Sequence, residues 1–299
     1  MTQIALYLIN HVAKIANVSV GGKNPVRIMG ILNTSPESFY KKSVNTSKTS
    51  IKNSVKLIES QGANFIDIGG MSTAPYLSTM ISEKTESKRI LDAIKIIQNS
   101  TNLPISVDTC RASVASDALE HGVEIINDVS GLKYDEKMPD VVSKFSPSLI
   151  LCAFSPKIVI GNPITSSKKL LRDSIQIAKK SNMSPEKIVL DPAIGFFRKS
   201  GKGPFFTKIK SDWLERDLSV LKNLNSIKQT FPILISVSNK SFIGKILGKE
   251  NPNDRIFGSI VAETISVMNG ADIIRTHNVE ATKDTITITS KLLNKHKGL

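Results

Sequence analysis

Short apolar runs alternate with longer segments of helical periodicity from about residue 25 onward. Several runs are apolar at successive positions, which is typical of parallel strands covered on both faces. The runs span residues 27–33, 65–70, 104–108, 123–128, 148–154, 187–192, 232–238 and 271–277. The segments of helical period between them include residues 54–63, 86–100, 112–122 and 259–271. Eight strand-then-helix units predict an α/β fold, a (β/α)₈ TIM barrel, with a doubly wound parallel sheet as the alternative.

Glycines and loop composition divide the chain further. Gly62, Gly122 and Gly270 each follow a helical segment and precede a strand, as helix C-caps do. Residues 1–25 are interpreted as a short N-terminal extension, a hairpin that closes the bottom of the barrel, and residues 26–299 as the barrel domain. The Gly- and Lys-rich segments 156–167 and 198–212 predict long loops.

Composition excludes several classes of protein. Apolar residues make up 40% and charged residues 22%, which favours a soluble globular chain. The net charge of +14 is spread along the chain, so an acidic small substrate is favoured over a nucleic acid. No run reaches the roughly 18 apolar residues of a membrane span, and the first residues lack a signal-peptide pattern. A cytoplasmic location is therefore expected. Cys110 and Cys152 lie far apart, which argues for structural roles rather than a disulfide or zinc site.

Polar residues gather at the carboxyl ends of the predicted strands, where barrel enzymes place their active sites. They are Asn33, Gly69, Gly70, Asp108, Asn127, Asp128, Asp191, Lys240, Arg275 and His277. Each has a simpler reading: Asp108 is compatible with a helix cap, Asn127 with a turn and Lys240 with a solvated lysine. Strand alternation places Arg275 and His277 on one side and Thr276 on the other.

The joint pattern predicts the kind of ligand. Gly69 and Gly70, followed by Ser72 and Thr73, offer backbone N–H groups and hydroxyls to an anion. Carboxylates and an amide occupy one part of the mouth, and Lys, Arg and His another. Such a site suits a heterocycle that donates hydrogen bonds at one end and carries negative charge at the other.

Seven motifs in order resemble the dihydropteroate synthase family, a group of pterin-binding (β/α)₈ barrel enzymes. The resemblance runs from about Arg27 to Thr285. The motifs are MGILNTSPESF (29–39), IDIGGMSTAP (66–75), ISVDT (105–109), INDVSGL (126–132), LDPAIGF (190–196), SNKSFIG (238–244) and GADIIRTHNV (270–279). The resemblance implies a transferase that joins 6-hydroxymethyl-7,8-dihydropterin diphosphate to p-aminobenzoate and releases diphosphate.

The resemblance also implies roles by position. Its pterin-binding positions match Asp108, Asn127, Asp191 and Lys240, and its diphosphate-contacting positions match Asn33, Thr73, Arg275 and His277. Asn33 further matches a magnesium ligand, so Mg²⁺ is the expected cofactor. The implied mechanism is dissociative: diphosphate leaves first, and the arylamine nitrogen traps the methylene cation. Lys240, Arg275 and His277 are the expected catalytic residues, and a homodimer is the expected assembly.

The chain departs from the family on the arylamine side. Tyr40, Lys41 and Lys42 replace an acidic, glycine-rich stretch, and Ala74 replaces an arginine. Met71 replaces a glutamate and Asn239 a basic residue. One hypothesis is a larger, phosphorylated arylamine acceptor, with room made by Ala74 and a phosphate held by Lys41 and Lys42. The alternatives are a pterin-dependent corrinoid methyltransferase, a pterin-binding protein without turnover and, third, a basic nucleic-acid-binding module.

Overall fold

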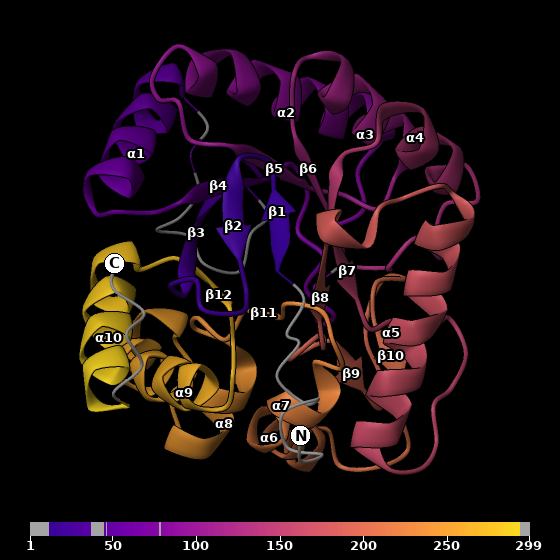
Figure 1. Cartoon of the computed structure of the whole chain (residues 1–299), viewed down its shortest axis with the longest axis vertical. Helices are drawn as coiled ribbons and strands as arrows, with labels where there is room; N and C mark the ends of the chain where they lie inside the picture. The colour runs from indigo at the N-terminus through magenta and orange to yellow at the C-terminus, as the bar shows by residue number, and fades with distance from the viewer. Residues whose placement is uncertain (1–11, 37–44, 46, 78, 294–299) are drawn as a thin grey trace, which may run out of the picture.

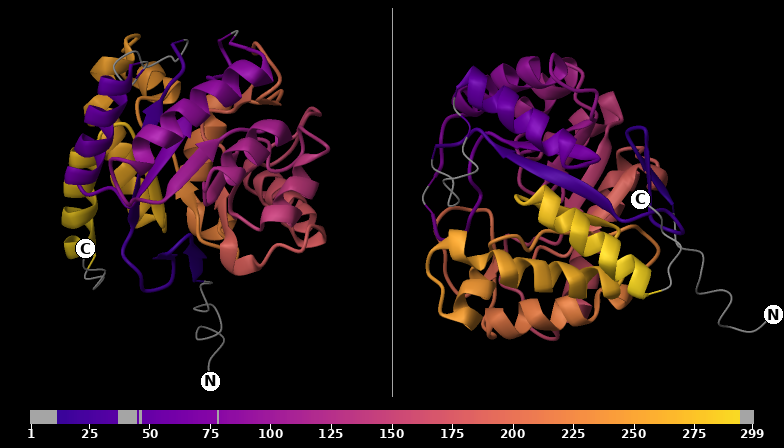
Figure 2. Two further views of the ribbon diagram at one scale, coloured as in Figure 1. Left: turned by 90° about the horizontal axis from the view of Figure 1, so that it is seen from above. Right: turned by 90° about the vertical axis from the view of Figure 1, so that its left-hand side faces the viewer.

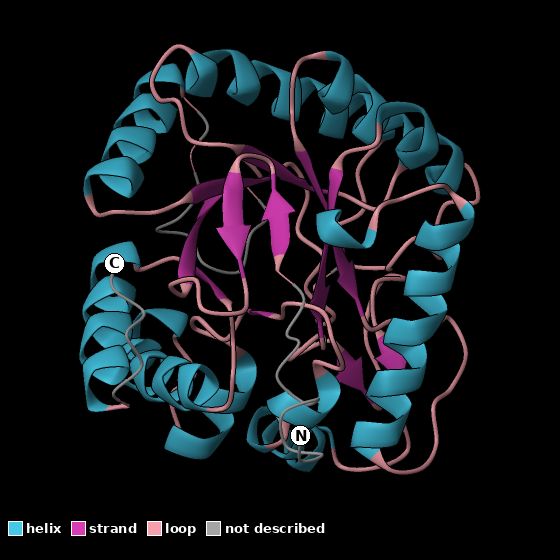
Figure 3. Cartoon of the chain, in the orientation of Figure 1, coloured by secondary structure: helices cyan, strands magenta, loops and turns pink. Residues whose placement is uncertain are grey.

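Eight parallel strands form a nearly closed barrel inside a ring of helices (Figures 1 and 3). The computed structural model describes residues 12–36, 45, 47–77 and 79–293. The barrel strands are β3 (Arg27–Asn33), β4 (Phe65–Gly69), β5 (Ile105–Asp108), β6 (Ile125–Asp128), β7 (Ser148–Cys152), β8 (Ile188–Asp191), β11 (Leu234–Ile235) and β12 (Ile273–Thr276). Their order is β11-β12-β3-β4-β5-β6-β7-β8. A parallel bridge between Leu190 and Ile233 joins the two ends, which confirms the barrel and excludes a doubly wound sheet.

Helices follow the strands in the predicted rhythm. They are α1 (Lys48–Ser60), α2 (Glu83–Gln98), α3 (Ala112–Glu120), α4 (Met138–Phe145), α5 (Pro163–Lys180), α6 (Trp213–Lys222), α7 (Leu224–Ile227), α8 (Ser241–Leu247), α9 (Ile256–Met268) and α10 (Val279–Leu292). Gly62, Gly122 and Gly270 take φ values of +94°, +84° and +100° just past α1, α3 and α9, as C-cap glycines do. Among the described helices, none is long and apolar enough to cross a membrane.

Side chains that point into the barrel form an apolar layer at its bottom. One residue from each of seven barrel strands contributes: Met29, Phe65, Ile125, Ile150, Val189, Leu234 and Ile273. The antiparallel hairpin of β1 (Ala13–Ile15) and β2 (Val18–Val20) packs its buried side chains against this layer. It lies across one end of the barrel (Figures 1 and 2). The hairpin thus closes the end opposite the carboxyl ends of the strands.

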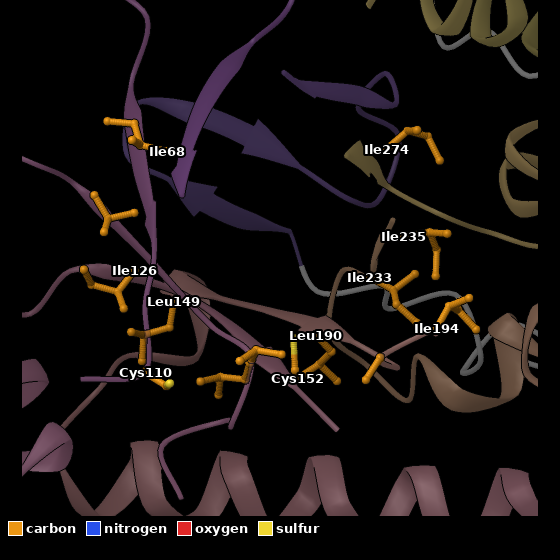
Figure 4. Close-up of a cluster of buried hydrophobic side chains, with 14 of the residues drawn as sticks. Ile68, Cys110, Ile126, Leu149, Cys152, Leu190, Ile194, Ile233, Ile235 and Ile274 are labelled. Carbon is orange, nitrogen blue, oxygen red and sulfur yellow. The ribbon is translucent and has the colours of Figure 1, made fainter. Parts of the chain in front are cut away.

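Side chains that point outward from the same strands build the larger core beneath the helices. Ile68, Ile126, Leu149, Leu190, Ile233, Ile235 and Ile274 belong to it (Figure 4). Cys110 and Cys152 lie in this core as buried free thiols, and burial raises the pKa of both well above the ordinary value. A structural role agrees with this packing.

The two segments predicted as long loops are more regular than expected. Residues 163–167 form the start of α5, where the Asn162 side chain caps the helix. In the second segment, β9 (Phe197–Arg198) pairs in parallel with β10 (Thr207–Lys208). Sequence periodicity missed β9 and β10 because two-residue strands carry no measurable alternation.

We predict that the hairpin contributes to the stability of the barrel. Replacing the fully buried Ile15 with alanine removes apolar contacts at the barrel bottom. The free energy of unfolding should fall by about 2–5 kcal/mol in urea denaturation. Val12→Ala, at an exposed position beside the same strand, should change it by less than about 0.5 kcal/mol. Equal effects of the two substitutions would contradict this assignment.

Candidate active site

A cavity opens at the carboxyl ends of the barrel strands. Six of the eight residues predicted for the site line it: Asn33, Thr73, Asp108, Lys240, Arg275 and His277. Ser72, Ala74, Tyr76, Phe196 and Ser241 also contribute to its wall. The strands are parallel and in register, so their last inward-facing residues meet at the same edge. Predicted site residues that belong to separate sequence motifs therefore lie together in one cavity.

Two carboxylates hold the Arg275 guanidinium at the base of this cavity. Arg275 Nε donates to Asp67 Oδ2 at 2.6 Å, and its Nη2 donates to Asp108 Oδ2 at 2.8 Å. Burial disfavours the charged guanidinium, but Asp67 and Asp108 outweigh it and raise the pKa of Arg275. Burial raises the pKa of Asp108 to about 7 despite the attraction of Arg275. Arg275 therefore stays charged and fixed in orientation.

Asp67 is the central site residue that the sequence reading missed. This fully buried carboxylate accepts hydrogen bonds from Ser106 Oγ at 2.5 Å and Asn127 Nδ2 at 3.2 Å, besides the one from Arg275. A signal was present, because Asp67 stands inside an otherwise apolar strand. A carboxylate is rarely buried unless it is paired, so Asp67 required a cationic partner.

Lys240 and Asp191 form a second pair of opposite charges at the site. Lys240 is the N-cap residue of α8 and donates from Nζ to the Ile194 carbonyl. Burial lowers the pKa of Lys240 to about 8, against the attraction of Asp191. Burial also raises the pKa of Asp191, whose Oδ1 accepts from the Ala193 N–H at 2.7 Å. Lys240 is therefore a partly buried site residue rather than a solvated surface lysine.

Two predicted pterin-binding residues are buried and are not among the residues that line the cavity. Asn127 is 5% exposed and Asp191 is 8% exposed. Asn127 is linked to the cavity through Asp67, and Asp191 through the electrostatic attraction of Lys240. The turn interpretation of Asn127 is wrong, because the residue lies within β6. The cap interpretation of Asp108 is also wrong, because Asp135 accepts from the first N–H group of α3 instead.

The expected division into an acidic and a cationic half is wrong. Arg275 lies between Asp67 and Asp108, so opposite charges alternate across the site. His277 is not a cation: burial, together with the charges of Arg275 and Lys240, lowers its pKa to about 3. Its Nδ1 lies 3.1 Å from Ser238 Oγ. A neutral imidazole here can donate one hydrogen bond but adds no charge.

The residues that depart from the resembled family have distinct surroundings. Asn239 adopts φ +56° and its N–H donates to Ser259 Oγ at 2.8 Å. This left-handed conformation favours asparagine over a long basic side chain. Met71 is buried and, like Ala74, contributes to the cavity wall. Tyr40, Lys41 and Lys42 lie outside the described residues.

Comparison with known proteins identifies the class of this barrel. The model of the family described as "Pterin binding enzyme" matches residues 29–277. The chain therefore belongs to the pterin-binding enzyme family. The dihydropteroate synthase of Synechocystis is 33% identical to it over 85% of this chain and 86% of the relative.

Solved structures agree with this assignment. A Clostridium difficile dihydropteroate synthase, determined in the presence of pteroic acid, superposes with a TM-score of 0.78 and 33% identity. The superposition covers 90% of this chain and 97% of the Clostridium chain. A Xanthomonas albilineans dihydropteroate synthase with 4-aminobenzoic acid gives a TM-score of 0.80 at 25% identity, covering 94% of this chain and 98% of the other. Fold and sequence therefore point to the same family.

The Asp67–Arg275 pair should be required for stability. Asp67→Asn removes the charge that faces Arg275 Nε and leaves Asp108 as its remaining carboxylate partner. We expect the free energy of unfolding at pH 7 to fall by about 3 kcal/mol, the lower end for a broken buried pair. Asp92→Asn, in an exposed pair with Lys88, should cost less than about 0.5 kcal/mol. Urea denaturation of both variants measures the difference, and an unaltered Asp67→Asn variant would contradict the assignment.

Proposed function

We propose that this chain is a dihydropteroate synthase, a transferase of folate biosynthesis. It joins 6-hydroxymethyl-7,8-dihydropterin diphosphate to p-aminobenzoate and releases diphosphate. The observation that carries the proposal is a single cavity that collects Asn33, Thr73, Asp108, Lys240 and Arg275 from five motifs at the barrel mouth. The named relatives support this activity, as do the solved structures determined in the presence of pteroic acid and with 4-aminobenzoic acid.

The part of the site around Lys240 and Asp191 suits the pterin ring. The amino and ring N–H groups of a pterin are donors, and the Asp191 carboxylate can accept from two of them. Lys240 has three N–H donors, of which one faces the Ile194 carbonyl, so another can serve the ring oxygen. Asn127 and Asp108 supply further polar groups along the ring edge. These contacts hold the pterin in one orientation.

The reaction then needs stabilisation of the leaving group rather than a protein nucleophile. The bond from the pterin methylene carbon to the diphosphate oxygen breaks, and the electron pair leaves with the diphosphate. The arylamine nitrogen forms the new C–N bond and loses a proton to solvent. Arg275, fixed by two carboxylates, stabilises the departing charge, and His277 and Thr73 donate hydrogen bonds to it.

Magnesium fits the leaving-group end of the site. Within the described residues no group of three or more His, Cys, Asp or Glu side chains is placed so that it could hold a metal ion. Mg²⁺ commonly takes one or two protein oxygens and completes its shell with phosphate and water. The Asn33 side chain on the cavity wall can supply one such oxygen. When bound, the ion would neutralise charge on the diphosphate.

The comparisons do not favour the alternative functions. The named relatives are synthases, which argues against a corrinoid methyltransferase and against a binding protein without turnover. The larger, phosphorylated acceptor stays a hypothesis, because Lys41 and Lys42 lie outside the described residues. The cytoplasmic location likewise stays a prediction.

A turnover assay tests the proposed function. The protein is incubated with the pterin diphosphate, Mg²⁺ and either p-aminobenzoate or a phosphorylated aminobenzene, and both dihydropteroate and diphosphate are measured. We expect equal amounts of the two products with p-aminobenzoate. Pterin binding without either product, for every arylamine, would overturn the proposal. Preference for the phosphorylated compound would instead support the altered acceptor.

Lys240 should contribute directly to pterin affinity. Lys240→Gln removes a charged donor from the part of the site proposed to bind the pterin. The binding free energy of the pterin, measured by calorimetry, should therefore weaken by about 1.5–3 kcal/mol. Lys245→Gln, on the exposed side of the same helix, is the matched control and should bind normally. Because burial lowers the pKa of Lys240 to about 8, the ammonium is lost as pH rises through that value. The wild-type advantage over Lys240→Gln should therefore shrink above pH 8.

Asn33 should couple diphosphate binding to magnesium. In wild-type protein, chelation of Mg²⁺ is expected to weaken inorganic diphosphate binding. In Asn33→Ala the same chelation should have a smaller effect, because the ion has lost its protein ligand. Asn99→Ala, in the exposed C-cap of α2, should behave as wild type. Identical magnesium dependence in Asn33→Ala and wild-type protein would remove Asn33 as a ligand.

We further propose that the chain forms a homodimer through an apolar groove between α6, α8 and α9. Ile246, Leu247, Phe257 and Val261 line this groove, with Phe257 74% and Val261 63% exposed. Contiguous exposed apolar surface of this kind is typical of interfaces. Sedimentation velocity should show a wild-type dimer and a monomeric Phe257→Lys variant with unchanged circular dichroism. A monomeric wild-type protein at micromolar concentration would contradict the proposal.

A further inference from the structure

We call the part of the cavity wall formed by Ala74, Pro75 and Tyr76 the outer wall. It lacks the cation that the family resemblance leads us to expect. Ala74 stands where the resembled family carries an arginine, and its neighbours Pro75 and Tyr76 are uncharged. Lys240, which also lines the cavity, points its Nζ inward to the Ile194 carbonyl. The described part of this outer wall therefore presents no cationic side chain of its own. An acceptor with a carboxylate would need another positive group.

Arg198 lies directly behind this wall. Its side chain is 10% exposed, and its Nη2 donates to Ser241 Oγ at 2.8 Å. Ser241 itself lines the cavity. The guanidinium stacks over the Trp213 ring at 4.0 Å from the ring centre, and its Nη1 donates to the Phe197 carbonyl at 2.7 Å. These contacts fix the guanidinium one hydrogen bond away from the cavity.

The positive charge of Arg198 is only partly neutralised by its surroundings. Its ion-pair partner, Asp217, lies 3.7 Å away and is bound more closely by Arg216, at 3.0 Å. Asp217 is fully buried and also accepts from the Gly195 N–H. Two guanidinium groups therefore share one carboxylate in these ion pairs. The excess positive charge favours an anion at the adjacent wall.

The segment that carries Arg198 also contacts the loop that carries Ala74. The Lys202 N–H donates to the Pro75 carbonyl at 2.6 Å. A Cβ atom on Gly201 would lie 2.7 Å from the same carbonyl oxygen, so only glycine permits this close approach. The loop after β9 and the loop that carries Ala74 thus meet beside the outer wall, and Arg198 at the end of β9 is a cation next to the position that Ala74 leaves uncharged.

We propose that Arg198, acting through the Ser241 hydroxyl, recognises the carboxylate of the arylamine substrate; this inference rests on the proposed function. Ser241 Oγ accepts the Arg198 hydrogen bond, which leaves its own O–H free to donate into the cavity. A carboxylate that accepts this O–H lies within the field of the guanidinium. Arg198 is therefore a positioning residue for the acceptor and not for the pterin.

Selectivity between charged and neutral acceptors tests this role. We compare the KM and kcat for p-aminobenzoate with those for 4-aminobenzamide, which has the same shape without the charge. Arg198→Gln should raise the KM for p-aminobenzoate about tenfold with little change in kcat. The kinetics with 4-aminobenzamide and the affinity for pterin diphosphate should change less than twofold. Arg198→Lys keeps the charge and should retain part of the discrimination.

Two further variants separate recognition from a structural effect. Ser241→Ala should shift selectivity in the same direction as Arg198→Gln, and the double variant should lose little more than either single variant. Lys199→Gln, at an exposed neighbouring cation, is the matched control and should leave selectivity unchanged. A parallel loss with both acceptors, or additive effects in the double variant, would overturn the inference. Failure of the proposed function would instead show as wild-type protein that releases no diphosphate with any arylamine.

Discussion

The ion pairs of Arg275 with Asp67 and Asp108 are the constraint on which the mouth of the barrel depends. Arg275 extends from β12 past β3 to carboxylates on β4 and β5, so one side chain links three strands of the barrel. Without the guanidinium, the buried Asp67 carboxylate and the half-buried Asp108 carboxylate would repel each other. With it, the arginine is charged and immobile before any ligand arrives. The arrangement stabilises the fold, and under the proposed function it also holds a fixed cation ready for the leaving diphosphate.

The alternating layers of the barrel interior explain why this polar cluster is tolerated. Below it, seven aliphatic or aromatic side chains and the N-terminal hairpin fill the barrel. Moving two residues along a strand changes the inward side chain from Phe65 to Asp67, and from Ile273 to Arg275. The apolar layer supplies the packing energy, while the polar layer lies where a ligand can replace solvent. The residues that stabilise the barrel and the residues that form the site thus lie in successive layers along the same strands.

The sequence predicted most of the fold, because each strand–helix unit combines an apolar run with a periodic helix and often a terminal glycine. The strand β3 was predicted with its observed bounds, Arg27–Asn33. What the sequence could not supply is pairing across long separations. One partner of Arg275 is Asp67, 208 positions away along the chain. Arg275 was predicted to belong to a cationic half of the site, but it lies between two acidic residues, Asp67 and Asp108. The neutrality of His277 arises from burial and two neighbouring charges, which no local pattern reports.

The difference between strands and loops explains where this chain departs from its family. The proposed pterin contacts come largely from strand ends such as Asp108 and Asp191, whose positions are fixed by barrel closure, so replacing them would disturb the packed core. The outer wall is built by loops, which can exchange residues while the barrel remains unchanged. The charge of an arginine absent from position 74 can then be supplied by Arg198 at the end of β9, because this requires only the close approach at Gly201 and the hydroxyl of Ser241. The absence of an arginine from one motif therefore changes which segment of the chain supplies the positive charge, and the charge itself is retained.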